Sequence, residues 1–209
     1  SEAPILDGSS EPIMEAIGNA GLEALPAKRQ CMIVTKPVEV QLDYGARARL
    51  DPADNLQIDV KIEFDDHAIG TQAYNYIHKD GSFAAELACA RTFCQLRDVE
   101  LMQNAGLALG GSLNNAIVVD DGNILNEGGL RVEREFARHK VLDCLGDLFL
   151  IGMPVKAKMT VDRPGHALST KLVQALLNDP TAFKIVDASS KRSLASSFAM
   201  PEPAAAAMA

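Results

Sequence analysis

The sequence lacks a long apolar run, an excess of positive charge and any cysteine pair at metal-binding spacing. Its longest apolar run, residues 148–155, is far shorter than the roughly 20 residues that span a bilayer. Lys and Arg number 20 against 28 Asp and Glu, a net charge of −8, which argues against nucleic-acid binding driven by net charge. No signal peptide is evident. We therefore expect a cytoplasmic protein whose four cysteines are buried, reduced thiols: Cys31, Cys89, Cys94 and Cys144.

The chain also lacks the motifs of several large enzyme classes. It has no glycine-rich loop followed by Lys-Ser or Lys-Thr, no dinucleotide-binding glycine pattern and no Gly-x-Ser-x-Gly. A glycine pair occurs in Gly110-Gly111-Ser112, but a pair of this kind is typical of a turn. The sequence thus gives no support for a P-loop enzyme, a Rossmann dehydrogenase or a serine hydrolase.

What is present is the composition of an ordinary globular protein. Hydrophobic residues make up 47% of the 209 residues and charged residues 23%. This mix excludes wholesale disorder and a fibrous repeat, and the length allows one large domain or two small ones.

Periodicity predicts strands in the first half of the chain. After a short helix around Ile13 to Ile17, apolar and polar residues alternate over residues 38–42, 46–50 and 56–64. Three linked runs of this kind predict an antiparallel meander with one buried face.

Helices and strands are mixed in the second half. We expect helices at residues 82–93, around 99–102, at 133–151 and at 166–178, and strands at 116–119, 155–161 and 182–186. Strands first and mixed elements afterwards predict an α+β fold, a two-layer sheet/helix sandwich with the helices on one face of a sheet.

The longest predicted helix contains the first candidate for chemistry. His139 and Asp143 are four residues apart and therefore share a helix face, where an imidazole and a carboxylate could bind one metal ion. A hydrolytic zinc site needs a third protein ligand, and a surface hydrogen-bonded pair is the more common use of this spacing. Asp147, one turn further on, is either a solvated charge or a carboxylate that orients a histidine.

Three other histidines are less informative. His166 lies between a predicted strand and helix, where catalytic groups are often found, although a helix cap or a partly buried polar residue explains it equally well. His67 and His78 lie in a polar connection and are expected to be ordinary surface residues.

Several segments together are similar to one enzyme family. They are residues 4–9, Arg91-Thr92-Phe93, residues 109–112, 115–121, 125–131, 135–143 and 146–148, Gly165-His166-Ala167-Leu168 and Lys171-Leu172. In order and spacing they resemble the LpxC family, the zinc-dependent UDP-3-O-acyl-N-acetylglucosamine deacetylases of lipid A and lipopolysaccharide synthesis.

The resemblance implies two α+β domains with the active site between them. Residues 1–25 would form the end of the first domain and residues 26–200 the second, with an inserted acyl-passage unit near residues 96–119 and a flexible tail at 201–209. The family's opening part carries a Glu-His pair that supplies the third zinc ligand and the general base. No Glu-His pair occurs in this sequence, which begins at Ser1 without a methionine, so we expect a truncated or processed start with a missing N-terminal segment.

The resemblance also assigns residues. It makes His139 and Asp143 ligands of Zn²⁺, and it implies catalytic roles for a second group: His166, Thr92, Asp147 and Lys140. The positions that match substrate-binding residues of the family are Phe93, Phe64, Arg163, Leu96, Val99, Leu113, Ala116 and Val118. From the sequence alone Phe64 is as well explained as a core aromatic, and the passage positions as core.

The implied function is removal of the N-acetyl group from UDP-3-O-acyl-N-acetylglucosamine by a zinc-dependent amide hydrolase, with the isolated chain expected to be inactive. The alternative is a non-catalytic, truncated paralogue that keeps the fold and binds the UDP-sugar. In some relatives a membrane-bound ATP-dependent protease degrades the enzyme from an apolar carboxy terminus. Residues 204–209 are a candidate for such a handle.

Overall fold

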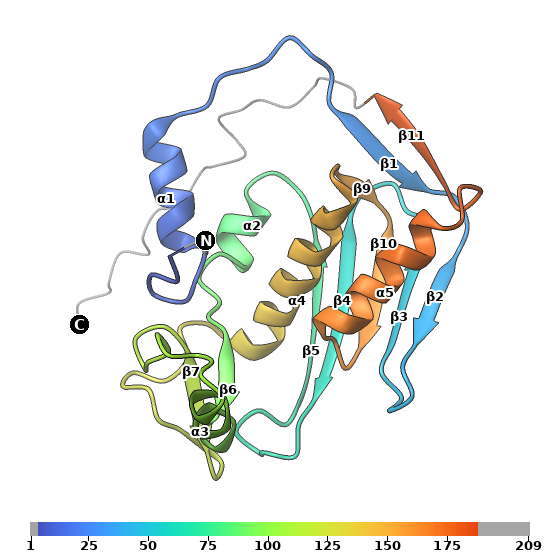
Figure 1. The fold of residues 1–209 in the computed structure, drawn as a ribbon. Helices are drawn as coiled ribbons and strands as arrows, with labels where there is room; N and C mark the ends of the chain where they lie inside the picture. The colour runs from blue at the N-terminus through green and yellow to red at the C-terminus, as the bar shows by residue number, and fades with distance from the viewer. Residues whose placement is uncertain (1–3, 188–209) are drawn as a thin grey trace.

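The computed structural model describes residues 4–187, which form five α-helices, one 3-10 helix and eleven strands (Figure 1). In chain order these are α1 (Glu11–Ala20), β1 (Gln30–Val34), β2 (Val38–Gln41), β3 (Arg47–Asp51), β4 (Gln57–Glu63), β5 (Thr71–Ile77), α2 (Ser82–Glu86), β6 (Phe93–Gln95), α3 (Leu96–Asn104), β7 (Ile117–Asp120), β8 (Asn123–Ile124), α4 (Glu135–Leu148), the 3-10 helix Phe149–Ile151, β9 (Val155–Lys156), β10 (Lys158–Asp162), α5 (His166–Leu177) and β11 (Phe183–Asp187). The predicted tail, including the proposed protease handle, lies outside the described residues.

The central sheet has the strand order β2-β3-β10-β4-β5. Strand β10 lies antiparallel to β3 and parallel to β4, so that Met159 is opposite both Leu50 and Ile58. Of the predicted antiparallel meander the β2–β3 pairing is confirmed, but the β3–β4 pairing is wrong, because β10 separates β3 from β4. The alternation in β3 and β4 specifies which face of each strand is buried, but it does not specify which strands pair.

Helices α4 and α5 cover one face of this sheet, as Figure 1 shows. The buried sheet residues form one continuous core with the buried faces of both helices. On the strands this core includes Leu50, Ile58, Val60, Ile62 and Met159, and on the helices Phe136, Val141, Leu145, Leu168, Leu172 and Leu176. The predicted α+β, two-layer arrangement is confirmed.

Two small sheets adjoin the central one, with the orders β11-β1-β9 and β6-β7-β8. The second, together with α3, forms a separate unit beside the first turns of α4 (Figure 1). The sequence did not predict β1 or β5, and the helix expected over residues 82–93 ends at Glu86. Strand β5 escaped detection because it is an edge strand in which only Tyr76 is fully buried.

Helix α1 stands apart from the two-layer core. Its first turn contains Pro12, and it is capped after Ala20 by Gly21, whose φ of 79° is positive. None of its residues is buried, and Ile13 and Ile17 remain 42% and 38% exposed. Residues 1–25 as the end of another domain remain a prediction.

Within the described residues, no helix is long and apolar enough to cross a membrane. All four cysteines are free, and Cys89 and Cys94 are only half-buried, so the expectation of burial holds for Cys31 and Cys144 alone.

Two leucines of α5 offer a matched test of the core. Leu172 is 0% exposed and Leu177 is 44% exposed. We expect Leu172→Ala to lower the free energy of unfolding by about 2–5 kcal/mol, because the change leaves a cavity between the helix and the sheet. Leu177→Ala should cost less than about 1 kcal/mol. Urea unfolding of the 209-residue chain, followed by circular dichroism, measures both; equal losses would contradict the packing of α5 described above.

Candidate functional site

The candidate site is built around His139 and Asp143 on α4. His139 is buried, with its side chain 10% exposed, and Asp143 has a side chain that is 17% exposed. The His139 Nε2 atom lies 3.4 Å from Asp143 Oδ1. The structure therefore brings the two predicted ligands together, and the interpretation of this spacing as a surface pair does not fit the burial of His139.

The surroundings of His139 favour a neutral ring with a defined tautomer. Burial lowers the pKa of His139, which outweighs the opposing attraction of Asp143. The Ala90 carbonyl lies 3.3 Å from Nδ1 and can only accept, so we assign the ring proton to Nδ1. The Nε2 lone pair then faces the Asp143 carboxylate.

Two electron-pair donors facing each other fit a shared cation. Atoms bound about 2.0–2.1 Å from a tetrahedral zinc lie about 3.3 Å apart, close to the observed separation. Among residues 4–187, however, no group of three or more His, Cys, Asp or Glu side chains is placed to hold a metal ion. The chain's residues thus fit two ligands of a zinc site, and the described part supplies no third.

Lys140 joins this pair to an aromatic surface. Its Nζ donates to Asp143 Oδ2 at 2.8 Å and lies 5.4 Å from the centroid of the Phe93 ring. Phe93 in turn packs edge-to-face on Phe64, with ring centroids 5.5 Å apart. Three predicted substrate or catalytic residues therefore form one series of contacts: Lys140 of α4, Phe93 of β6 and Phe64 in the loop after β4.

Asp143 and Asp147 lie one and two turns after His139 on the same face of α4. Both oxygens of Asp147 accept from His166 Nδ1, at 3.0 and 3.1 Å. His166 is the first residue of α5, one position after the N-cap Gly165, and its side chain is 70% exposed. The readings of His166 as a helix cap or a partly buried polar residue are wrong, and Asp147 holds the ring.

Two further predicted residues lie close by in the fold. Thr92 immediately precedes β6, and its carbonyl accepts from the Ile117 N–H at 2.8 Å. Arg163 follows β10 with a positive φ of 55°, and its Nη2 donates to Glu63 at 3.0 Å. Neighbouring residues of a strand point to opposite faces, so this ion pair lies on the exposed face and does not by itself bring Arg163 to Phe64.

The predicted passage residues all belong to the unit formed by α3, β6, β7 and β8. Ala116 and Val118 are buried, Leu96 and Val99 are half-buried, and Leu113 is 47% exposed. This unit also has exposed leucines at positions 101, 107 and 109. The residues are grouped in one unit, and their role as an acyl passage remains a prediction.

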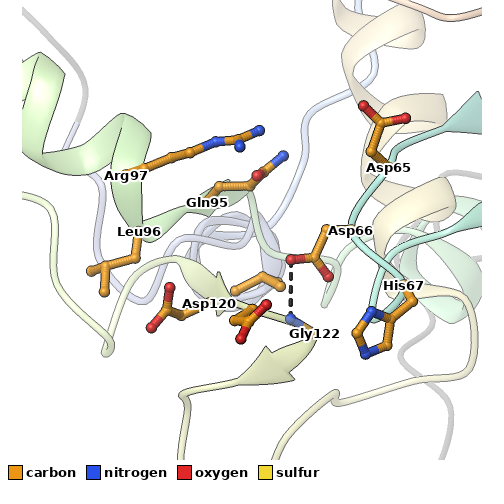
Figure 2. A pocket seen from close by; sticks show the side chains of 10 residues that line it. Asp65, Asp66, His67, Gln95, Leu96, Arg97, Asp120 and Gly122 are labelled. Atoms are coloured by element: carbon orange, nitrogen blue, oxygen red, sulfur yellow. Dashed lines mark hydrogen bonds between the residues drawn. The ribbon is translucent and has the colours of Figure 1, made fainter.

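A pocket of about 380 Å³ lies between this unit and the loop after β4 (Figure 2). It is lined by Asp65, Asp66, His67, Gln95, Leu96, Arg97, Val119, Asp120, Asp121 and Gly122. The Gly122 N–H donates to Asp66 Oδ2 at 3.2 Å, a bond that crosses from one side to the other. A wall with four carboxylates suits neither a diphosphate nor an acyl chain, and of the predicted site residues only Leu96 lines this pocket.

Sequence reasoning missed one buried ion pair beside the site. The Arg91 guanidinium donates through Nε to Glu135 Oε1 at 2.9 Å and through Nη2 to Oε2 at 3.1 Å. The side chains are 6% and 0% exposed. Burial by itself would raise the pKa of Glu135, but the hydrogen bonds from Arg91 and from the Arg131 N–H lower it below its usual range. Both residues stand within segments that resemble the family, yet no local pattern pairs them.

Glu135 should make stability depend on pH. A lowered pKa means that its contribution is present above the ordinary glutamate pKa of about 4.3 and is lost as the pH falls through the folded-state value. At pH 7 we expect Glu135→Gln to cost about 3–5 kcal/mol, because Arg91 is left buried without its counter-charge. The difference from the wild type should shrink below about pH 4.

Glu39→Gln is the matched control, since Glu39 pairs with Arg49 at an exposed site where both side chains are 41% exposed. We expect it to cost less than about 1 kcal/mol at either pH. Urea titrations at pH 7 and pH 3.5 measure both variants. A Glu135→Gln penalty that is the same at the two pH values would contradict an ionised Glu135.

Comparison with known proteins agrees with the resemblance. The model of the LpxC family, described as UDP-3-O-acyl N-acetylglycosamine deacetylase, matches residues 1–178 of this chain. Among curated relatives, a protein of Anaeromyxobacter sp. (strain Fw109-5) is 48% identical over 185 residues, which is 88% of this chain and 60% of that protein. A protein of Myxococcus xanthus is 44% identical over 187 residues, 90% of this chain and 59% of the relative.

Both relatives are named UDP-3-O-acyl-N-acetylglucosamine deacetylase, as is one of Nitrosococcus oceani that is 42% identical over 188 residues. This chain spans about 60% of the length of these relatives. The match covers the ion pair, the α4 residues and His166 alike. The chain therefore belongs to the LpxC family of UDP-3-O-acyl N-acetylglycosamine deacetylases.

Proposed function

We propose that this chain supplies part of the active site of a zinc-dependent hydrolase that removes the N-acetyl group from UDP-3-O-acyl-N-acetylglucosamine in lipid A synthesis. The observation that carries the proposal is the row of His139, Asp143 and Asp147 along one face of α4, with His166 bonded to its end. The names of the relatives support the reaction and the substrate.

His139 and Asp143 are the residues that would hold the zinc ion. Both present an unshared electron pair to the same point, and neutral imidazole and carboxylate are zinc ligands. A zinc ion bound there would supply a Lewis acid for the acetamide carbonyl and an acidified water molecule. Lys140, bonded to the second oxygen of Asp143, leaves the first free to bind.

His166 is the proposed charge-stabilising or proton-donating group. Because Nδ1–H is held by Asp147, Nε2 points away from that carboxylate, and the ring is largely exposed. A proton at Nε2 can offset a developing oxyanion or pass to the leaving amine nitrogen. The Thr92 hydroxyl is the proposed second partner of the carbonyl oxygen.

The remaining residues are proposed to bind substrate. Phe64 and Phe93 offer ring faces and edges to the uracil and sugar, and Lys140 and Arg163 supply positive charge for the diphosphate. The unit near residues 96–119 is proposed to receive the acyl chain through apolar side chains: Leu96, Val99, Leu113, Ala116 and Val118.

The described residues supply no third ligand for the His139–Asp143 pair, and the sequence contains no Glu-His pair, which in the family carries the general base. We propose that the 209 residues alone are inactive and that the reaction needs the part of the relatives that this chain does not match. The four free cysteines support a reducing, cytoplasmic location.

Zinc binding by the 209-residue chain should be weak. Two protein ligands do not complete a zinc site, so calorimetric titration should show no tight one-to-one binding. His139→Ala should reduce the residual binding further, whereas His67→Ala, outside the α4 site, should not. Tight stoichiometric binding by the chain alone would contradict the two-ligand assignment.

Activity can be tested in a chimera in which this chain replaces the matched segment of the Anaeromyxobacter sp. relative. We expect the chimera to release acetate from UDP-3-O-acyl-N-acetylglucosamine and the 209-residue chain not to. His166→Ala in the chimera should lower kcat by about 100-fold or more, because the charge-stabilising or proton-donating group is lost.

The control for this prediction is His67→Ala in the same chimera, for which we expect unchanged kcat. Acetate release by the bare chain at the rate of the chimera would contradict the need for further elements. A chimera that binds the UDP-sugar but releases no acetate would instead favour the non-catalytic paralogue.

A further inference from the structure

The segment that precedes Thr92 is tied to α4 at two successive turns. The Arg91 N–H donates to Glu135 Oε1 at 3.0 Å, and the neighbouring Ala90 carbonyl lies 3.3 Å from His139 Nδ1. Glu135 and His139 are four residues apart and therefore lie on one face of the helix. The chain segment thus runs along that face with one contact to the ion pair and the next to the candidate zinc ligand.

In this ion pair both carboxylate oxygens of Glu135 accept hydrogen bonds. Besides the two guanidinium bonds, Glu135 accepts from the Arg91 N–H and, at 2.6 Å, from the Arg131 N–H. Arg91 Nη2 also donates to the Gly129 carbonyl at 2.8 Å. A buried, fully bonded pair of this kind has one low-energy arrangement, and loss of either partner is costly.

The same network fixes Thr92 from both sides. The N–H of the preceding residue, Arg91, is held by Glu135, and the Thr92 carbonyl accepts from the Ile117 N–H at the start of the β6–β7 pairing. The next residue, Phe93, packs on Phe136 and His139, with centroid distances of 4.9 and 6.3 Å. Thr92 and His139 are therefore placed relative to each other by the Arg91–Glu135 bonds on one side and by the Ile117 bond and the Phe93 ring contacts on the other.

We infer that Arg91 and Glu135 are positioning residues of the active site. Their buried ion pair holds the Ala90 carbonyl against His139 Nδ1, so that Nε2 is directed towards the metal position. The same ion pair fixes Thr92 beside the metal position. This inference rests on the proposed function. A hydrogen bond to the second nitrogen of a ligating histidine fixes its tautomer and ring orientation, and loss of such a partner typically costs about 10- to 100-fold in metal affinity or activity.

The test is Arg91→Lys in the chimera, with Arg49→Lys as the matched control. Arg49 also makes a two-pronged bond to a carboxylate, that of Asp51, but its side chain is 41% exposed. Lysine keeps the charge and loses the planar fork at both sites.

We expect Arg91→Lys to weaken zinc binding and to lower kcat, each by about 10- to 100-fold, with KM changed less than about 3-fold. The absorption spectrum of the Co²⁺ form should change as well, and Arg49→Lys should match the wild type.

Measurements are made on protein whose near-ultraviolet circular dichroism is that of the wild type. Unchanged zinc affinity and kcat in folded Arg91→Lys would overturn the inference. Decreases in zinc affinity and kcat that are fully explained by the fraction of the variant that is unfolded would overturn it as well. If Arg91→Lys does not fold, Glu135→Gln, which keeps an acceptor for the backbone donors, is measured in its place against the same expectations.

A second measurement needs neither variant nor activity. Nitrogen-15 spectra of the wild-type 209-residue chain should show the His139 proton on Nδ1; a proton on Nε2 would overturn the inference. The two proposals can also fail separately. An inactive wild-type chimera with the Nδ1–H tautomer counts against the proposed reaction, whereas an active chimera indifferent to Arg91→Lys counts against the positioning role.

Discussion

Helix α4 can lie on the central sheet in only one rotational setting, and the candidate site depends on that constraint. Phe136, Val141, Cys144, Leu145 and Leu148 are all buried, so the helix cannot turn about its axis without exposing them. Apart from Glu135, which is buried with Arg91, the acidic residues and Lys140 then fall at the edge of the buried face. His139 is at the boundary, buried enough to be neutral, while Lys140, Asp143 and Asp147 keep contact with solvent.

The elements specified by local patterns were predictable from the sequence, and the pairings between distant segments were not. The apolar period of α4 and α5 and the alternation in β3 and β4 show directly which residues are buried. The position of β10 between those strands depends on contacts with residues about a hundred positions earlier. Strand β5, with one fully buried side chain, has too little pattern to be recognised.

The same distinction applies to the site. The spacing of His139 and Asp143 indicated a shared helix face, but burial, the tautomer and the contact with Ala90 required the fold. Arg91 and Glu135 are 44 positions apart, and nothing in either neighbourhood marks them as partners. Resemblance to a family assigned functional roles to many residues, yet it gave none to this pair, whose importance follows from burial and hydrogen bonding.

The place of β10 also bears on the order in which the sheet can assemble. Strands β2 and β3 form one antiparallel pair and β4 and β5 another, and the two pairs are joined only through β10, which pairs with both β3 and β4. A ribosome must therefore synthesise α4 before the strand that closes the sheet emerges. Until then two hairpins present open edges, a state in which chains are prone to associate wrongly. Contacts of such long sequence separation form slowly, so the sheet on which the α4 site rests is completed among the last events of folding.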